Sequence, residues 1–443
     1  MKILLCTVGG SHAPILTALN SGSWDHVEFV CTEDDPAAGK RGSVSMVRDH
    51  VEVPGRTVPP VSRLPSIPEQ ARLDPASWSV CLVAPDDPDG IFGKLVERLS
   101  ELQSAHPDAE IVVDFTGGTK SMSVGAALAV TARPPARLQV TTGTRSDLVR
   151  VLDGTEQPIV LRTDRLVIER QIELLRAAWT RFGYAEAAAG FDLLSETLAA
   201  AAPEQLRQRL NDLHHLSAAF AAWDRFDHRH VRESLNRVKS RYPDWVAPWM
   251  VRQSELLHDS VARSHPHKIC DLWLNAERRA ARGRYDDAVA RAYRLVEWTG
   301  QWLLGTRLGI DSGNVDLSAM DPAVLQRAGI QQRPDKRDLG GLESSLRLLA
   351  ALDPGGRMDA FLNRPLDDAA GRTGLDVLTK DLLPLRNRSI LAHGFDPLGE
   401  DKWNRWRAFI GDTFFSRMLL PELGAVGISG MPAQLPTAPP PDL

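Results

Sequence analysis

The sequence has few cysteines and no long apolar run, and each absence excludes a class of protein. Only 4 of the 443 residues are cysteine, and no two of them have metal-ligand spacing. Cys6, Cys31 and Cys81 lie in apolar, strand-like segments, as small buried hydrophobic residues do. No segment reaches the roughly 20 consecutive apolar residues of a membrane helix, so no membrane span is expected. The first apolar run is short and broken by Thr7 and Gly9, which indicates a strand rather than a signal peptide and predicts a cytoplasmic protein.

The chain also lacks the excess of positive charge that duplex nucleic-acid binding would favour. The net charge is −5, so an RNA site would have to be a local cleft lined by arginine. Hydrophobic residues make up 43% of the chain, which supports a globular core, and the length suffices for two or three domains. His265 and His267 precede Cys270 as metal ligands would, but no fourth ligand is nearby. We therefore expect no metal and no cofactor.

Residues 1–165 alternate short apolar strands with helices, the pattern of a doubly wound parallel α/β sheet. The expected strands are Lys2–Val8, Val27–Cys31, Val80–Ala84, Ile111–Phe115, Leu138–Thr142 and Leu148–Leu152. Helices are expected over Ile91–Gln103 and from Lys120 to Ala132.

From about residue 166 onward the periodicity is helical. Residues 166–265 have no fixed repeat and are expected to form an all-α connector. A break at His265–His267 precedes a second all-α domain over residues 266–425. The tail, residues 426–443, is rich in proline, glycine and alanine and is predicted to be disordered.

Two glycine-rich loops follow strands of the expected sheet. In such a sheet, ligands bind at the carboxyl ends of the strands, where glycine admits close backbone approach and a helix N-terminus offers free N–H groups. Neither loop has P-loop or dinucleotide spacing, and glycines that only serve tight turns are the alternative. The predicted ligand-binding residues are Thr7, Gly9, Gly10, Ser11, Thr116, Gly117, Gly118, Thr119, Lys120 and Ser121.

Near the C-terminus, the sequence predicts one short helix that opens at Pro384 and closes at Gly394. At about 100° per residue, seven steps bring Arg386 and His393 onto the same face, whereas Arg388 lies roughly 140° from His393. Arginine can hold phosphate oxygens, and histidine can move protons near neutral pH. The pair suits phosphodiester cleavage without a metal, if the nucleophile is the 2′-hydroxyl of RNA. An ordinary helix end with a solvated arginine is the alternative.

Both ends of the chain resemble known domains. Arg386, Asn387, His393 and Gly394 resemble the signature of HEPN ribonucleases, and the helices from Asn275 to Glu297 look like the start of that domain. The segment Asp114–Met122, with the loop after the first strand, resembles the ligand loops of CARF domains, the sensors of cyclic oligoadenylates in CRISPR defence. The chain is therefore similar to the CARF–HEPN family. The resemblance implies a homodimer with the cyclic ligand across the two-fold axis of the CARF pair and a ribonuclease site between two HEPN domains.

The resemblance also implies roles for individual residues. Arg386 would stabilise the transferring phosphate of single-stranded RNA, His393 would act as general acid or base, Asn387 would position the helix or substrate, and Glu297 would orient Arg386. For Glu297, a salt bridge on the helix surface is the alternative. Two other functions stay open: a ligand-binding regulator without catalysis, and a ring nuclease that cleaves its own cyclic ligand in the CARF site.

Overall fold

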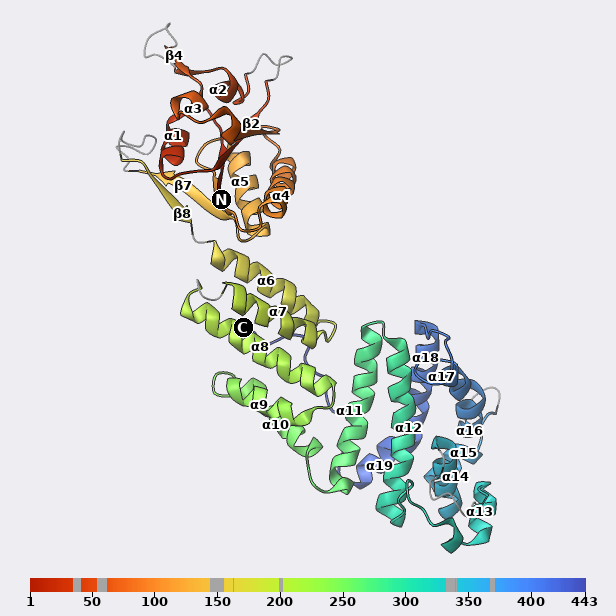
Figure 1. The fold of residues 1–443 in the computed structure, drawn as a ribbon. Helices are drawn as coiled ribbons and strands as arrows, with labels where there is room; N and C mark the ends of the chain where they lie inside the picture. Colours follow the sequence, from red (N-terminus) through yellow and green to blue (C-terminus); the bar gives the residue numbers. More distant parts are fainter. Residues whose placement is uncertain are drawn as a thin grey trace. The chain divides into compact units, whose positions relative to one another are not determined.

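The computed structural model describes residues 1–34, 41–53, 62–143, 155–161, 163–198, 202–331, 339, 341–366 and 371–443 (Figure 1). The chain forms two compact units, Met1–Gln171 and Ile172–Leu443, and the boundary falls within helix α6 (Asp164–Trp179). Among the described residues, no helix combines the length and the apolar character that a membrane span requires.

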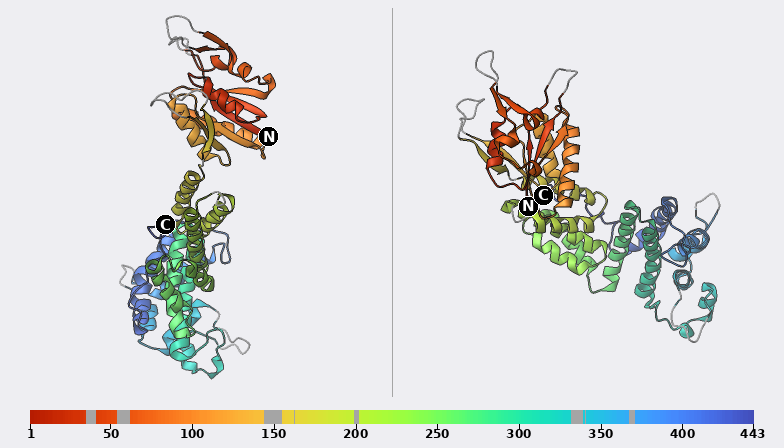
Figure 2. Two further views of the ribbon diagram at one scale, coloured as in Figure 1. Left: turned by 90° about the vertical axis from the view of Figure 1, so that its left-hand side faces the viewer. Right: turned by 45° about the horizontal axis from the view of Figure 1, so that its top comes forward.

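The N-terminal unit contains a six-stranded sheet in the order β5-β2-β1-β6-β7-β8. Its strands are β1 (Lys2–Thr7), β2 (His26–Thr32), β5 (Trp78–Val83), β6 (Glu110–Asp114), β7 (Arg137–Thr142) and β8 (Gln157–Leu161). Helices cover both of its faces (Figure 2). The parallel α/β core is confirmed, but the edge strand β8 pairs antiparallel with β7, so the sheet is mixed. The predicted strand Leu148–Leu152 lies outside the described residues.

Alternation along β1 explains the two cores of this unit. Ile3 and Leu5 face the core shared with α4 (Pro88–Ala105) and α5 (Lys120–Ala132). Leu4 and Cys6 point the other way, to the core shared with α1 (Ala13–Asn20). Because successive side chains of a strand face opposite sides, a strand covered on both faces is apolar throughout.

A second, small sheet was not predicted from the sequence. Strands β3 (His50–Val53) and β4 (Ser62–Pro65) pair antiparallel, between the short helices α2 (Ser45–Arg48) and α3 (Ile67–Gln70). Four-residue strands give too short an alternating pattern to stand out from a loop.

The C-terminal unit is all-helical. Helices α11 (Val261–Ala281) and α12 (Tyr285–Leu308) lie side by side, joined by a tight turn (Figure 1). The expected break at Pro266 is wrong, because α11 continues through this proline from Val261. The helices before and within the predicted HEPN region are α7 (Tyr184–Leu198), α8 (Glu204–Asp224), α9 (His228–Val238), α10 (Pro243–Leu256), α11 (Val261–Ala281), α12 (Tyr285–Leu308), α13 (Pro322–Ala328), α14 (Leu342–Leu352), α15 (Arg357–Asn363), α16 (Gly374–Asp376), α17 (Leu383–Asn387), α18 (Glu400–Ala408) and α19 (Leu420–Ala425).

The tail, which the sequence predicts to be disordered, packs against these helices instead. The side chain of Gln434 accepts from Nη1 of Arg278 (2.6 Å) and donates to the carbonyl of Leu274 (2.9 Å). Tyr184 Oη donates to the carbonyl of Pro436 (2.7 Å), and Leu435 is buried. Composition alone suggests disorder, but a proline-rich segment can still satisfy buried polar groups that the helices leave open.

Candidate functional site

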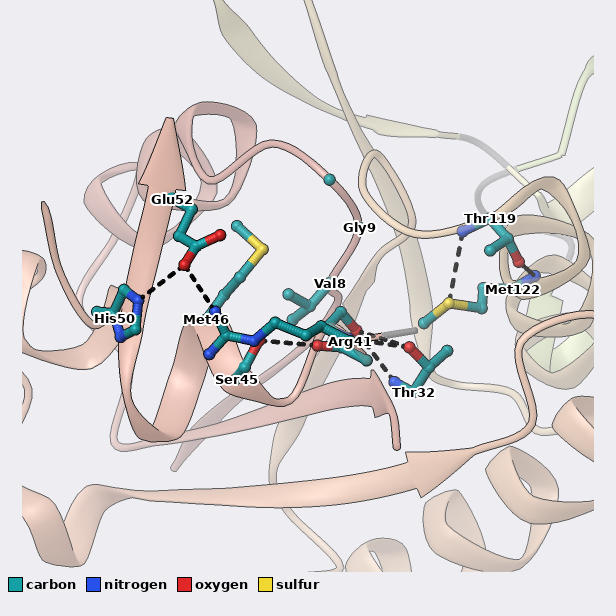
Figure 3. A pocket seen from close by; sticks show the side chains of 13 residues that line it. Val8, Gly9, Thr32, Arg41, Ser45, Met46, His50, Glu52, Thr119 and Met122 are labelled. Atoms are coloured by element: carbon teal, nitrogen blue, oxygen red, sulfur yellow. Dashed lines mark hydrogen bonds and ion pairs between the residues drawn. The ribbon is translucent and has the colours of Figure 1, made fainter. Parts of the chain in front are cut away.

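A pocket of about 290 Å³ opens beside the carboxyl ends of β1 and β2 in the N-terminal unit (Figure 3). Both glycine loops contribute to its wall, and the segment that leads into β3 completes it. The lining residues are Val8, Gly9, Gly10, Thr32, Arg41, Gly42, Ser43, Ser45, Met46, His50, Glu52, Thr119 and Met122. The pocket therefore lies where ligands of doubly wound sheets bind.

The glycines of the two loops let their backbones touch. A Cβ on Gly9 would lie 2.4 Å from the amide nitrogen of Gly118, and one on Gly117 would lie 2.2 Å from the carbonyl oxygen of Thr7. Gly118 also has a φ of +83°, which L side chains rarely adopt. Glycines that serve tight turns and glycines that form a ligand-binding loop are thus compatible interpretations. The contact that requires glycine at these positions also brings the two loops together.

Three threonines that we predicted as ligand-binding residues make hydrogen bonds that hold the loops. Thr7 Oγ1 donates to the carbonyl of Gly117 (2.6 Å), and Thr116 Oγ1 accepts from the backbone N–H of Thr141 (2.6 Å). Thr119 Oγ1 donates to a carbonyl of the loop between β5 and α4 (2.7 Å). These threonines shape the site by fixing its backbone, and their binding of a ligand stays a prediction.

Asp114, at the end of β6, anchors the second loop. Its carboxylate accepts from the backbone N–H of Thr116 (3.0 Å) and from Nε2 of Gln139 (3.1 Å). Burial raises the pKa of Asp114, while these hydrogen bonds oppose the rise. The carboxylate is therefore a structural support rather than a group that faces the pocket.

Of the predicted ligand-binding residues, Gly9, Gly10 and Thr119 line the pocket. Ser11 and Lys120 are exposed next to it in sequence, and Lys120 opens helix α5. The N–H of Met122 is capped by Thr119 Oγ1 (3.2 Å), so an anion at this terminus would have to bind the N–H groups of Lys120 and Ser121.

The sequence reasoning missed the polar residues of the opposite wall. Arg41 Nη1 lies 2.8 Å from Glu52 Oε1, and His50 Nε2 lies 3.2 Å from the same oxygen (Figure 3). The hydrogen bond with His50 and the charge of Arg41 lower the pKa of Glu52. The signal that could have found the pair is the His50–Glu52 spacing, because alternate residues of a strand share a face.

The second site lies around Arg386, and its geometry differs from the prediction. Helix α17 ends at Asn387 instead of continuing to Gly394, so the shared helical face of Arg386 and His393 does not exist. The following loop is closed by backbone bonds from His393 N to the carbonyl of Asn387 (3.2 Å) and from Asp396 N to that of Arg388 (2.9 Å). Gly394 is required there, since its Cβ would lie 2.2 Å from the Arg388 oxygen.

The side chains of this segment are placed in distinct surroundings. Cζ of Arg386 lies 4.3 Å from the centroid of the Tyr293 ring, and Nη1 donates to Oδ1 of Asn387 (3.1 Å). Arg388 instead donates from Nε to the carbonyl of Pro384 (3.2 Å). His393 is exposed in the loop.

Glu297 was predicted to orient Arg386, but the structure pairs it with another arginine. Its Oε2 lies 2.5 Å from Nη1 of Arg294, one turn earlier on α12. Glu297 therefore forms an ion pair within its own helix, as the alternative interpretation expects. Tyr293, which the sequence reasoning did not single out, takes the place beside Arg386.

Metal-binding groups do not gather in the described parts of the chain: no cluster of three or more histidine, cysteine or acidic side chains is placed to hold an ion. Cys270 is buried within α11, and burial raises its pKa to about 12. A thiol in this state is a poor metal ligand at neutral pH.

Comparison with known proteins finds a matching domain model and a similar solved structure. Residues 258–415 match the family model of the Csm6 HEPN domain. The fold is similar to that of Csm6 from Enterococcus italicus, solved in complex with cyclic hexa-2′-fluoro-hexa-dAMP. That match has 14% sequence identity and a TM-score of 0.53, and it covers 96% of this chain and 95% of the other. No curated protein matches the sequence.

The matched HEPN region contains Tyr293, Glu297, Arg386 and His393, whereas both glycine loops lie outside it. The loops belong instead to the mixed parallel sheet of the N-terminal unit. Residues 258–415 therefore match the Csm6 HEPN domain, and the fold is similar to that of Csm6 over almost the whole length of both chains.

Proposed function

We propose that this protein is a cyclic-oligoadenylate-activated, metal-independent endoribonuclease that cleaves single-stranded RNA in the cytoplasm as part of CRISPR antiviral defence. The observation that carries the proposal is the surroundings of Arg386 within the region that matches the HEPN domain. Its guanidinium rests on a neutral ring and bonds a neutral amide. An arginine supported by uncharged partners keeps its full charge for a phosphate.

In the proposed reaction, the 2′-hydroxyl of the substrate loses its proton and attacks the adjacent phosphorus. The O2′–P bond forms, the P–O5′ bond breaks, and the leaving 5′-oxygen takes up a proton. Arg386 stabilises the negative charge that develops on the phosphoryl oxygens. The exposed imidazole of His393 serves one of the two proton transfers. Asn387 fixes one guanidinium nitrogen of Arg386. No step needs a metal, since the nucleophile is part of the substrate.

A homodimer is proposed from the apolar groups around the HEPN site. Ile390 and Phe395 flank His393 with 64% and 91% of their surface exposed. Exposed apolar groups next to a reactive segment are typical of an interface, and a second copy would bury them and supply a second Arg–His pair. In the N-terminal unit, Val124 and Leu128 are likewise exposed, one turn apart on α5. A dimer that covers them would bring two copies of the ligand pocket together.

The cyclic activator is proposed to occupy the N-terminal pocket. The related Csm6 structure carries a cyclic hexanucleotide analogue, and here the glycine loops, the exposed Lys120 and the Arg41–Glu52–His50 group offer partners for phosphates and bases. Lys120 adds a positive charge to the positive end of α5.

One assay tests the proposal. Purified protein is incubated with single-stranded RNA and EDTA, alone and with each cyclic oligoadenylate. We expect cleavage only with one ring size, and none in the His393→Ala variant. Cleavage that requires a divalent metal, or that persists in His393→Ala, would contradict it. Analysis of the cyclic ligand in the Arg386→Ala/His393→Ala double variant separates the ring-nuclease alternative, because only that activity would survive.

A further inference from the structure

Tyr293 lies directly against the guanidinium of Arg386. It is half-buried on α12, and its ring centroid is 4.3 Å from Cζ of Arg386. This distance falls well inside the roughly 6 Å over which a cation is attracted to an aromatic face. Tyr293 lies on α12 and Arg386 on α17. Because these two helices belong to one packed domain, the contact fixes the position of the guanidinium at the end of the long, flexible arginine side chain.

The nearby carboxylate does not neutralise this arginine. Glu297, one turn beyond Tyr293, is paired with Arg294 at 2.5 Å. Arg294 in turn lies over the ring of Trp298, at 5.7 Å from its centroid, so that ion pair has its own support. Arg386 is therefore oriented by an aromatic face, and a carboxylate that would compete with a phosphate is held away from it.

The remaining contacts decide which edge of the guanidinium is available. Nη1 of Arg386 donates to Asn387, and Nε is buried without an acceptor among the described residues. An unsatisfied buried N–H is costly, but a buried Nε is not open to a phosphate, which is left with the Nη atoms at the end of the side chain. Arginine binds phosphate through two adjacent N–H groups, and the edge formed by Nη1 and Nη2 is one of the two such edges.

Tyr293 is itself held in place and stays neutral. Burial, followed by the charge of Glu297, raises the pKa of its phenol. The charge of Arg386 and the backbone of Leu342, the first residue of α14, oppose that rise. The ring is thus half-buried on α12, with its polar end near the start of α14.

We infer that Tyr293 is a positioning residue for catalysis: its ring face holds the guanidinium of Arg386 in place, away from any carboxylate partner among the described residues, so that the Nη1–Nη2 edge is left for the scissile phosphate of RNA. This inference rests on the proposed ribonuclease function, in which Arg386 binds the phosphate. It assigns to an aromatic side chain the orienting role that the sequence suggested for a carboxylate.

The test compares Tyr293→Leu, which removes the ring face, with Tyr293→Phe, which keeps it. Tyr285→Leu is a matched control, because Tyr285 is another partly buried tyrosine of α12 packed against the same core. RNA cleavage is measured under EDTA with saturating cyclic activator. A small misplacement of a catalytic group can cost about 100-fold in rate, so we expect Tyr293→Leu to lower kcat between about 10- and 100-fold with little change in KM. Tyr293→Phe and Tyr285→Leu should stay within about 3-fold of wild type.

A double variant separates positioning from a general loss of structure. If Tyr293 acts through Arg386, then Arg386→Ala/Tyr293→Leu is no slower than Arg386→Ala alone. Additive losses, or a Tyr293→Phe variant as slow as Tyr293→Leu, would overturn the inference. Full activity of Tyr293→Leu beside an inactive Arg386→Ala would overturn it and leave the ribonuclease proposal intact. Full activity of Arg386→Ala would instead remove the ribonuclease proposal itself.

Discussion

Gly9 and Gly118 touch backbone to backbone, with 2.4 Å between the position of a Gly9 Cβ and the amide nitrogen of Gly118. This contact joins the loop after β1 to the loop after β6 and sets the wall of the N-terminal pocket. Gly9→Ala must push the two loops apart, and overpacking of this kind costs about 1–3 kcal/mol. We expect weaker binding of the cyclic activator and a lower Tm. Gly93→Ala on α4 is the control, since nothing lies within 4 Å of a Cβ there and Gly93 does not line the pocket; equal effects of both variants in a binding titration would show that the contact is unimportant.

Arg386→Ala should damage RNA cleavage far more than Arg388→Ala. Arg388 is exposed, and among the described residues its side chain bonds only the carbonyl of Pro384, whereas Arg386 is held on Tyr293. The loss of one charge-stabilising donor typically costs about 100- to 1,000-fold in kcat, and we expect a loss of this order for Arg386→Ala only. Comparing the two turnover numbers checks this, and an equal loss would mean that the phosphate is bound elsewhere.

The free energy of unfolding should fall in mild acid because of buried His228. Among the described residues, neither of its ring nitrogens has a hydrogen-bond partner, and burial lowers its pKa from 6.5, with nearby Lys268 and Arg252 adding to the effect and Asp271 opposing it. Above pH 6.5 the ring is neutral in both the folded and the unfolded state. Below it, the unfolded state binds the proton first, so stability is lost at up to about 1.4 kcal/mol per pH unit.

Denaturant unfolding at pH 7.5 and pH 5.5 measures this effect of His228. The variant His228→Phe should lose less stability across that interval than wild type. Part of the pH dependence of the free energy of unfolding should remain, because burial also lowers the pKa of His26 and His215. The same pH dependence in both proteins would show that His228 does not contribute.

Gln434 should stabilise the C-terminal unit. It bonds Arg278, which is fully buried and also pairs with Asp224, and it bonds the backbone of α11 at Leu274. Gln434→Ala leaves a buried charged group short of a partner, at a cost of about 1–3 kcal/mol. A thermal melt should show a lower Tm, while Thr437→Ala, at an exposed position of the same tail, should not change it. An unchanged Tm in Gln434→Ala would indicate that the tail does not bind this surface in solution.

Long, strongly patterned elements could be predicted from the sequence. The strand that ends before Gly9 and the helix that begins at Lys120 have the expected bounds to within a residue, because burial on both faces leaves a continuous apolar signal. The hairpin with His50 and Glu52 could not be found, since its strands are short and their partners depend on tertiary contacts.

The segment after Pro384 shows a different limit of sequence reasoning. Residue spacing assumes a continuous helix, but Asn387 and Ser389 favour local turns, and Gly394 permits a close approach to the backbone of Arg388. The residue types at the site were identified from the sequence, whereas their arrangement required the structure. Tyr293 was missed for a different reason: an aromatic residue on a helix normally belongs to the core, so its sequence position does not indicate a role beside Arg386.

The central claim is that one chain joins a cyclic-oligoadenylate sensor to a metal-independent ribonuclease. The most direct measurement follows the cleavage of single-stranded RNA by the full-length protein in EDTA, across a titration of each cyclic oligoadenylate. The account predicts saturable stimulation by one ring size, lost in His393→Ala while activator binding is retained. RNA cleavage that is independent of every cyclic oligoadenylate, or unchanged in His393→Ala, would contradict it.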